Sequence, residues 1–191
     1  MTSLSKEEKC LNAIKKKDIA TVKNLISEGL NTNSVVNSSG YVGRTLLHWA
    51  ADYRQIDICG LLIEYGADVN INDGDGRTPL HVAATRCLDI CELFIQCGVD
   101  IDFTNKCGET SLYRAVEKGL FDICELLIER GSDVNSKNNN GQALLHRAAG
   151  KGYLEICELL IQKDANVNIK SDDGQTPLHW AARKGYHDIC K

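Results

Sequence analysis

Apolar residues recur along the chain in two alternating helical patterns. In the stretch TPLHVAA, Leu80, Ala83 and Ala84 fall at positions i, i+3 and i+4, and the small alanines permit close approach of a neighbouring helix. Thr78 offers an N-cap hydroxyl and Pro79 a preset first helical residue. The pattern predicts a short helix that begins at Thr78.

A second and more apolar pattern follows each of these stretches. Ile123, Leu126 and Leu127 keep the helical period, and Gly131 suits a left-handed C-cap. The segment after it, SDVNSKNNNGQ, is rich in Asn, Asp, Ser and Gly, which favours an extended arm with a tight turn at its tip. We therefore expect two antiparallel helices followed by a projecting finger.

The whole unit repeats with a period of 33 or 32 residues, marked by Gly43, Gly76, Gly108, Gly141 and Gly174. These glycines introduce RTLLHWAA, RTPLHVAA, ETSLYRAV, QALLHRAA and QTPLHWAA. One helix pair cannot bury both of its apolar sides alone. Neighbouring copies are therefore expected to stack through nearest-neighbour contacts.

The pattern G-x-TPLH-x-AA followed by G-A-D-V-N closely resembles the ankyrin repeat, and it covers essentially the whole chain. The resemblance implies an all-α ankyrin-repeat solenoid of stacked antiparallel helix pairs with projecting β-hairpin fingers. The expected segments are an N-terminal capping helix pair with a long first finger (1–39), four repeats (40–72, 73–104, 105–137 and 138–170) and a partial fifth repeat (171–191).

Several segments depart from the repeat pattern. Ser5 and Glu8 fit a capping box at the start of the first helix. The first finger carries about four extra residues, which are either a neutral insertion or a functional loop. The turn between the helices of the second repeat is one residue shorter and is expected to be tight or distorted. Ser111, Tyr113 and Ala143 replace usual capping residues, so weaker caps are expected there. The repeat that stops at Lys191 is expected to leave an apolar face open, as in a fragment of a longer protein.

Composition and charge limit the classes of function that the chain can have. The chain has 22 basic and 26 acidic residues, a net charge of −4, so no overall positive field favours nucleic acid. The N-terminus has no secretory signal and no run of 18 apolar residues occurs, so we expect no membrane span and a cytoplasmic protein. Its state is expected to be a monomer or part of a longer repeat array.

Nine cysteines invite a disulfide or zinc hypothesis. Five of them share one helical column, whose neighbours lie about 8–10 Å apart, whereas a disulfide requires Cα atoms within about 7 Å. We therefore expect buried free thiols in this column and at Cys10, and accessible ones at Cys87, Cys97 and Cys107. No pair has zinc-ligand spacing, so no metal is expected. The column consists of Cys59, Cys91, Cys124, Cys157 and Cys190.

The histidines are not catalytic candidates, because His48, His81, His146 and His179 each occupy the H of TPLH. In ankyrin-like folds this side chain forms hydrogen bonds near the finger base and links repeats. No phosphate-binding loop or catalytic combination lies outside the repeat columns. We expect neither enzymatic activity nor a cofactor.

The resemblance also implies that a protein partner binds the concave side, formed by finger tips and first helices, where residues vary between copies. Tyr41, Arg44, Trp49 and Tyr53 are the best hot-spot candidates, since Tyr, Trp and Arg often anchor interfaces. Alternatively, Trp49 packs between repeats. An abundance of basic residues predicts an acidic or mixed-charge partner. The remaining expected binding residues are Arg77, Arg86, Arg114, Arg147, Trp180 and Arg183.

These features predict a non-enzymatic protein–protein interaction module. The alternative is the recognition part of a larger protein, such as a ubiquitin-ligase adaptor or a pathogen or viral effector. Asn70 and Asn135 also resemble, in the form L-x5-D-V-N, the asparagines that asparaginyl hydroxylases modify in ankyrin proteins, although most such matches only form fingers.

Overall fold

The computed structural model of the chain describes residues 4–38 and 40–191, and its helices are all α-helices. Residues 1–3 and 39, which belong to the expected N-terminal segment and first finger, lie outside the described part. Within that part, β pairing is limited to isolated bridges such as Val35 with Thr45 and Lys137 with Ala143. The expected all-α repeat fold is confirmed.

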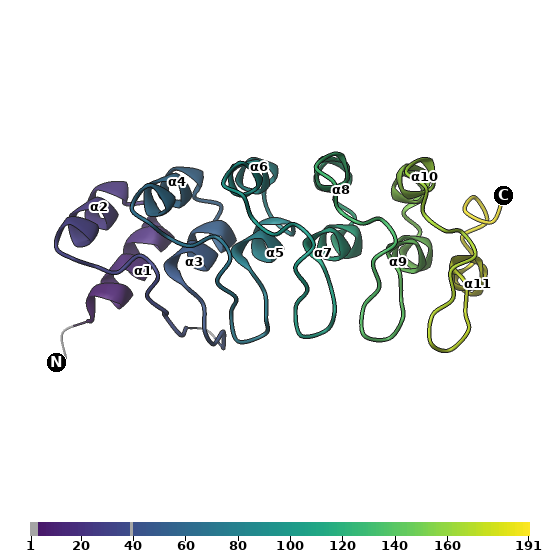
Figure 1. Ribbon diagram of the computed structural model, residues 1–191, viewed down its shortest axis with the longest axis horizontal. Coiled ribbons are helices and arrows are strands. Elements are labelled where there is room, and N and C mark those ends of the chain that lie inside the picture. The colour runs from purple at the N-terminus through teal and green to yellow at the C-terminus, as the bar shows by residue number, and fades with distance from the viewer. Residues whose placement is uncertain (1–3, 39) are drawn as a thin grey trace. The chain divides into compact units, whose positions relative to one another are not determined.

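The chain divides into two compact units, Met1–Asp100 and Ile101–Lys191. In the first unit, the first helices α1, α3 and α5 pack side by side in one layer, and the second helices α2, α4 and α6 form the other (Figure 1). The helices are α1 (Lys6–Lys16), α2 (Ile19–Ser27), α3 (Leu46–Asp52), α4 (Ile56–Glu64), α5 (Pro79–Ala83) and α6 (Leu88–Gln96).

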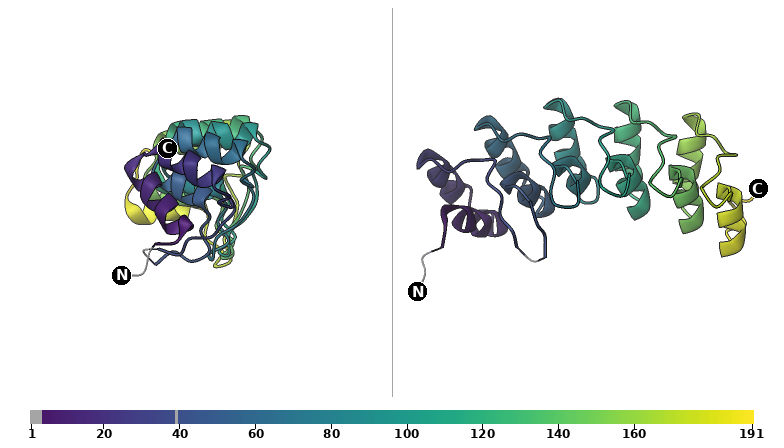
Figure 2. Two further views of the ribbon diagram at one scale, coloured as in Figure 1. Left: turned by 90° about the vertical axis from the view of Figure 1, so that its left-hand side faces the viewer. Right: turned by 60° about the horizontal axis from the view of Figure 1, so that its bottom comes forward.

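The second unit repeats the two layers. Here α7, α9 and α11 pack in sequence, α8 contacts α10, and the fingers extend from the first-helix layer (Figures 1 and 2). The helices are α7 (Ser111–Lys118), α8 (Phe121–Glu129), α9 (Leu144–Lys151), α10 (Leu154–Gln162) and α11 (Pro177–Lys184).

Helix caps agree with what the sequence predicts. The Ser5 hydroxyl accepts from the Glu8 amide (3.1 Å) and the Glu8 carboxylate from the Ser5 amide (2.9 Å), so the capping box is confirmed. In the third repeat the Thr110 hydroxyl accepts from the Tyr113 amide at 3.1 Å. In the second repeat, by contrast, His81 Nδ1 also accepts from the Thr78 amide at 3.2 Å, so the third cap has one bond fewer, as expected. Ala143 has no hydroxyl, and its own amide donates to His146 Nδ1 instead (3.1 Å).

The shortened turn of the second repeat has the expected effect. Helix α5 contains 5 residues, against 7 in α3 and 8 in α7. Its C-cap, Ala84, stays in the right-handed region (φ −61°), whereas Gly119 closes α7 in the left-handed region (φ 70°). Losing one residue thus removes the left-handed cap and shortens the helix.

Fingers are joined to their neighbours by backbone hydrogen bonds. In the first unit the longer first finger folds into a hairpin, with the Val36 amide donating to the Arg44 carbonyl (2.8 Å), and the Gly74 amide donates to the Val42 carbonyl (2.8 Å). In the second unit the Asn139 amide donates to the Cys107 carbonyl (2.9 Å).

Gly43 combines two requirements that only glycine meets. Its φ is +76°, and a Cβ there would lie 2.7 Å from the backbone nitrogen of Gly74. Gly66 has a similar φ of +85° with nothing within 4 Å. Comparing alanine substitutions at the two positions therefore separates the cost of left-handed backbone strain from the cost of crowding the neighbouring finger.

We predict that Gly43→Ala destabilises the protein more than Gly66→Ala does. Gly66→Ala should lower the free energy of unfolding by about 1 kcal/mol through left-handed strain alone. Gly43→Ala should cost about 2 kcal/mol more, because the neighbouring finger must move. Urea denaturation followed by circular dichroism measures both, and equal losses would contradict the close-approach explanation.

All nine cysteines are free, but they differ in accessibility. Cys10, Cys59, Cys91, Cys124 and Cys157 are buried as expected, and burial raises the pKa of Cys10, Cys124 and Cys157 to about 12. The expectation is wrong for Cys190, which is exposed. Residues 187–190 form turns rather than a second helix, so nothing packs this thiol into the column.

Brief alkylation of the native protein should therefore modify Cys97, Cys107 and Cys190, because these thiols are exposed. The five buried cysteines should react only after unfolding. Peptide mass spectrometry of iodoacetamide-treated protein, native and in urea, reads out each site. Rapid native labelling of Cys124 or Cys157 would show that the column is not closed.

Candidate protein-binding face

In each unit the fingers and first helices form a surface, called here the finger face, on which residues differ between repeats. In the first unit Arg44 is its centre. The Arg44 guanidinium carbon lies 3.6 Å from the Tyr41 ring centroid and 4.9 Å from that of Trp49. Its Nη1 donates to Asp52 at 2.9 Å, and its Nε lies 3.6 Å from an Asp73 oxygen. Arg44 is thus held by two rings and two carboxylates, and only 3% of it is exposed.

Trp49 ties the long first finger to α3. Its indole Nε1 donates to the Val36 carbonyl at 2.9 Å, and the residue is 1% exposed. The Tyr41 ring meets Trp49 edge-on with centroids 5.8 Å apart, and Tyr53 stacks on it at 6.3 Å. The alternative that Trp49 packs inside the stack agrees with this geometry. A partner can contact the two other aromatic residues of this group, because Tyr41 is half-buried and Tyr53 is 38% exposed.

The other two expected binding cations of the first unit, Arg77 and Arg86, are paired. Arg77 donates to Asp73 through Nε (3.0 Å) and Nη2 (2.8 Å) and lies 2.7 Å from Asp75. Arg86 approaches Asp52 at 2.7 Å and remains 42% exposed. Burial raises the pKa of Asp73, but the hydrogen bonds from Arg77 outweigh burial and the net pKa is lowered. The first-unit cluster is therefore close to charge balance.

In the second unit Glu117 connects two first helices. It accepts from Arg114 of its own helix (2.6 Å) and pairs with Arg147 of α9, while Glu109 lies 3.5 Å from Arg114. Burial raises the pKa of Glu117, yet the hydrogen bond from Arg147 and the charge of Arg114 bring the net pKa below its usual value. Arg114 and Arg147 are thus partly engaged in holding the repeats together.

Trp180 and Arg183 form the last aromatic–cation pair of the face. The Arg183 guanidinium lies 5.8 Å from the Trp180 ring, and Trp180 meets His146 edge-on with centroids 5.7 Å apart. A Cβ on Gly150 would lie 2.7 Å from the Trp180 ring, so this glycine makes room for the indole. Trp180 is half-buried and Arg183 is exposed.

The structure gathers the expected binding residues of the first unit into one cluster and those of the second unit into two groups. Tyr41, Arg44, Trp49, Tyr53, Arg77 and Arg86 form the cluster, and Arg114, Arg147, Trp180 and Arg183 lie on the first helices of the second unit. Sequence reasoning missed the carboxylates that hold these cations, above all Asp73. Its position in the finger DGDGR, four residues before Arg77, was the available signal.

Comparison with known proteins identifies the family. A family model for three copies of the ankyrin repeat matches residues 10–105, 68–138, 87–171 and 112–191. The chain belongs to the ankyrin-repeat family.

Relatives of this ankyrin-repeat chain match over short segments. An ankyrin repeat protein of Fowlpox virus is 38% identical over 40% of the chain, and the palmitoyltransferase akr1 of Schizosaccharomyces pombe is 50% identical over 30%. The NF-kappa-B inhibitor cactus of Drosophila yakuba is 46% identical over 25%. The matched segments span 10%, 9% and 10% of these relatives' lengths, so the similarity concerns the repeats.

Two of the ankyrin histidines, His48 and His146, join a first helix to the next finger. His48 Nδ1 accepts from the Thr45 amide at 3.2 Å, which leaves Nε2–H to donate to the Arg77 carbonyl at 2.8 Å. His146 likewise bonds the Gln175 carbonyl at 2.9 Å. Tyr113 replaces this histidine in the third repeat, and its hydroxyl accepts from Asn138 Nδ2 at 3.1 Å. Each bond reaches the following finger of its unit.

Asn70 and Asn135 also join neighbouring repeats. Asn70 Oδ1 accepts from the Asp100 amide at 3.1 Å, and Asn135 Oδ1 accepts from the Asn166 amide at 2.8 Å. Both amides therefore have a structural role in the ankyrin stack. Their hydroxylation stays a prediction.

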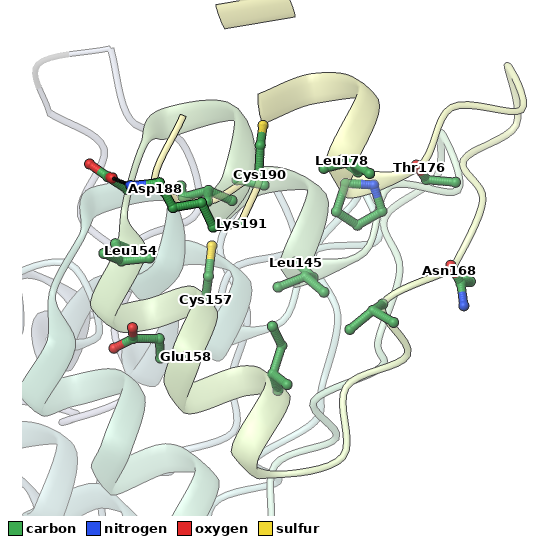
Figure 3. A pocket seen from close by; sticks show the side chains of 15 residues that line it. Leu145, Leu154, Cys157, Glu158, Asn168, Thr176, Leu178, Asp188, Cys190 and Lys191 are labelled. Carbon is green, nitrogen blue, oxygen red and sulfur yellow. Dashed lines mark hydrogen bonds and ion pairs between the residues drawn. The ribbon is translucent and has the colours of Figure 1, made fainter. Parts of the chain in front are cut away.

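An apolar groove of about 500 Å³ lies between α9, α10, α11 and residues 188–191 (Figure 3). Leu178 on its wall is 53% exposed, whereas Leu145, at the same place in the preceding repeat, is 4% exposed. This agrees with the expected open apolar face. Within the described residues, no three His, Cys, Asp or Glu side chains gather as metal ligands, and no helix is long and apolar enough to cross a membrane.

Burial is the largest influence on His48 and lowers its pKa to about 4, although the Arg77 carbonyl and Asp73 favour the charged form. The unfolded chain therefore binds a proton that the native state does not, and stability present above pH 6.5 is lost as pH falls toward 4. We predict that wild-type protein loses about 3 kcal/mol over this range through His48. Urea denaturation of wild type and His48→Gln at pH 7 and pH 4.5 tests this. The same pH dependence in both proteins would contradict it.

Proposed function

We propose that this chain is a non-enzymatic module that binds a protein partner on the finger face, which the family's architecture makes concave. The observation that carries the proposal is the placement of Tyr, Trp and Arg residues, at positions that differ between copies, on that face of a repeated scaffold. Such residues are enriched in interface hot spots. Tyr53 and Arg86 present accessible surface, while the more buried Arg44 and Trp49 fix the first finger beneath them.

The relatives support protein recognition. One of them is named as an inhibitor of NF-kappa-B, and the family model matches nearly the whole chain. By analogy, the partner here is a protein. The nine free thiols support a reducing, cytoplasmic compartment.

A second candidate is the recognition part of a larger protein, such as a ubiquitin-ligase adaptor or a viral effector. The matched segments are a tenth or less of the relatives' lengths, and these relatives include a viral protein and a palmitoyltransferase. In this case the finger face has the same binding role, and another segment supplies the activity.

Affinity capture from cell lysate with paired variants tests the proposed face. Tyr53→Ser with Arg86→Gln removes an exposed ring and a cation from the finger face. Tyr65→Ser with Lys23→Gln removes the same groups from the C-cap of α4 and from α2, where both are exposed. Proteins captured by wild type should be lost with the first variant, by about tenfold in affinity if both residues are anchors. Equal capture by the two variants would refute the face.

A further inference from the structure

Charge in the second unit is separated between the two helix layers. The first helices α7, α9 and α11 carry six Lys or Arg residues and one carboxylate, Glu117. The second helices α8 and α10 carry five carboxylates and no Lys or Arg. The first-helix layer of this unit is therefore positive although the whole chain is acidic. A local field of this kind attracts an acidic partner.

Three of these cations form a regular row, Lys118, Lys151 and Lys184. Each is the last residue of its first helix and precedes a left-handed glycine, with φ of 70°, 79° and 75°. The three side chains therefore start from equivalent points of successive repeats. All three residues are exposed, and none forms an ion pair or hydrogen bond with another described residue.

The lysine row differs from the arginine row one turn earlier. Arg114 and Arg147 share Glu117, which links α7 to α9. The lysines form no such ion pair with a described residue, although the charge of Lys118 contributes to the lowered pKa of Glu117. Their favourable interaction with the helix C-terminus is worth about 0.3–1 kcal/mol and explains a single lysine at a helix end. It leaves the charge of each ammonium group open to a ligand.

We propose that the lysine row binds an extended acidic segment of a partner protein, with a carboxylate at every third residue. This rests on the proposed function and specifies the partner of the same face. Packed helices lie about 8–10 Å apart, which sets the spacing of the lysines along the row. A polyproline II chain has three residues per turn and advances about 3.1 Å per residue, so every third side chain points the same way at intervals of about 9 Å. One carboxylate then meets each lysine.

Trp180 and Arg183 provide the end of this binding site. They occupy α11, the helix that also carries Lys184, and the cation–π contact at 5.8 Å places Arg183 beside the ring. Arg183 supplies an exposed planar cation, which binds a carboxylate through two parallel hydrogen bonds. The segment's terminal acidic residue is therefore expected at α11.

Fluorescence anisotropy with defined peptides tests the proposal on the full chain. The probe is a labelled Pro/Ser peptide with a glutamate at every third position, and the matched peptide has the same composition with its glutamates contiguous. The spaced peptide should bind about fivefold more tightly, since each added exposed ion pair contributes modestly. Its affinity should fall as salt is raised.

The variant Lys118→Gln with Lys151→Gln should weaken binding of the spaced peptide about fivefold. Its control, Arg130→Gln with Lys163→Gln, removes the same charge from the C-caps of α8 and α10 and should leave binding unchanged. Circular dichroism checks that both variants are folded.

Equal affinity for the two peptides, equal loss in the two variants, or tighter binding of a single-stranded oligonucleotide would overturn the proposal. The lysine-row proposal and the proposed function fail separately. If the spaced peptide does not bind but Tyr53 and Arg86 still determine partner capture, only the lysine row is refuted.

Discussion

Burial between successive helix pairs is the constraint on which this structure depends. Each pair has apolar residues on two sides, so it is stable only when a neighbour covers them. Leu145 on α9, which α11 packs against, is 4% exposed, whereas Leu178 at the same position of α11 is 53% exposed. Histidines and finger hydrogen bonds then fix the angle and register of what burial brings together.

Within this scaffold, charge has two different uses. Arg44 and Arg77 lie among Asp52, Asp73 and Asp75, where their charge is matched and the long first finger is held in place. Breaking such a buried pair leaves an uncompensated charge and costs much more than breaking an exposed one. Lys118, Lys151 and Lys184, the lysine row of the second unit, are not matched in this way. Buried paired cations therefore build the face, and exposed cations such as Arg86 and the lysine row are those available to a partner.

Most of the fold follows from the sequence because a repeat displays its local rules several times. Glycine positions, capping residues and helix spacing fix the helices, and the capping box of Ser5 and Glu8 needs only four consecutive residues. The environment of Arg44 was less accessible to this reasoning, since it depends on how an insertion folds back over α3 and on an aspartate 29 residues away. Cys190 was mispredicted for a similar reason. Its place in the cysteine column implies burial only if residues 187–190 form a helix, and they form turns instead.

The distribution of charge also bears on specificity. A face that presented only aromatic side chains would bind many apolar segments. A row of cations at the spacing of the repeats instead favours partners whose acidic residues have the same spacing. The scaffold itself sets that spacing through helix packing, so it cannot be changed by a single substitution. Substitutions on the first helices change which side chain each repeat presents to a partner. The repeat thus separates the geometry of recognition, which is shared by the family, from its chemistry, which belongs to this chain.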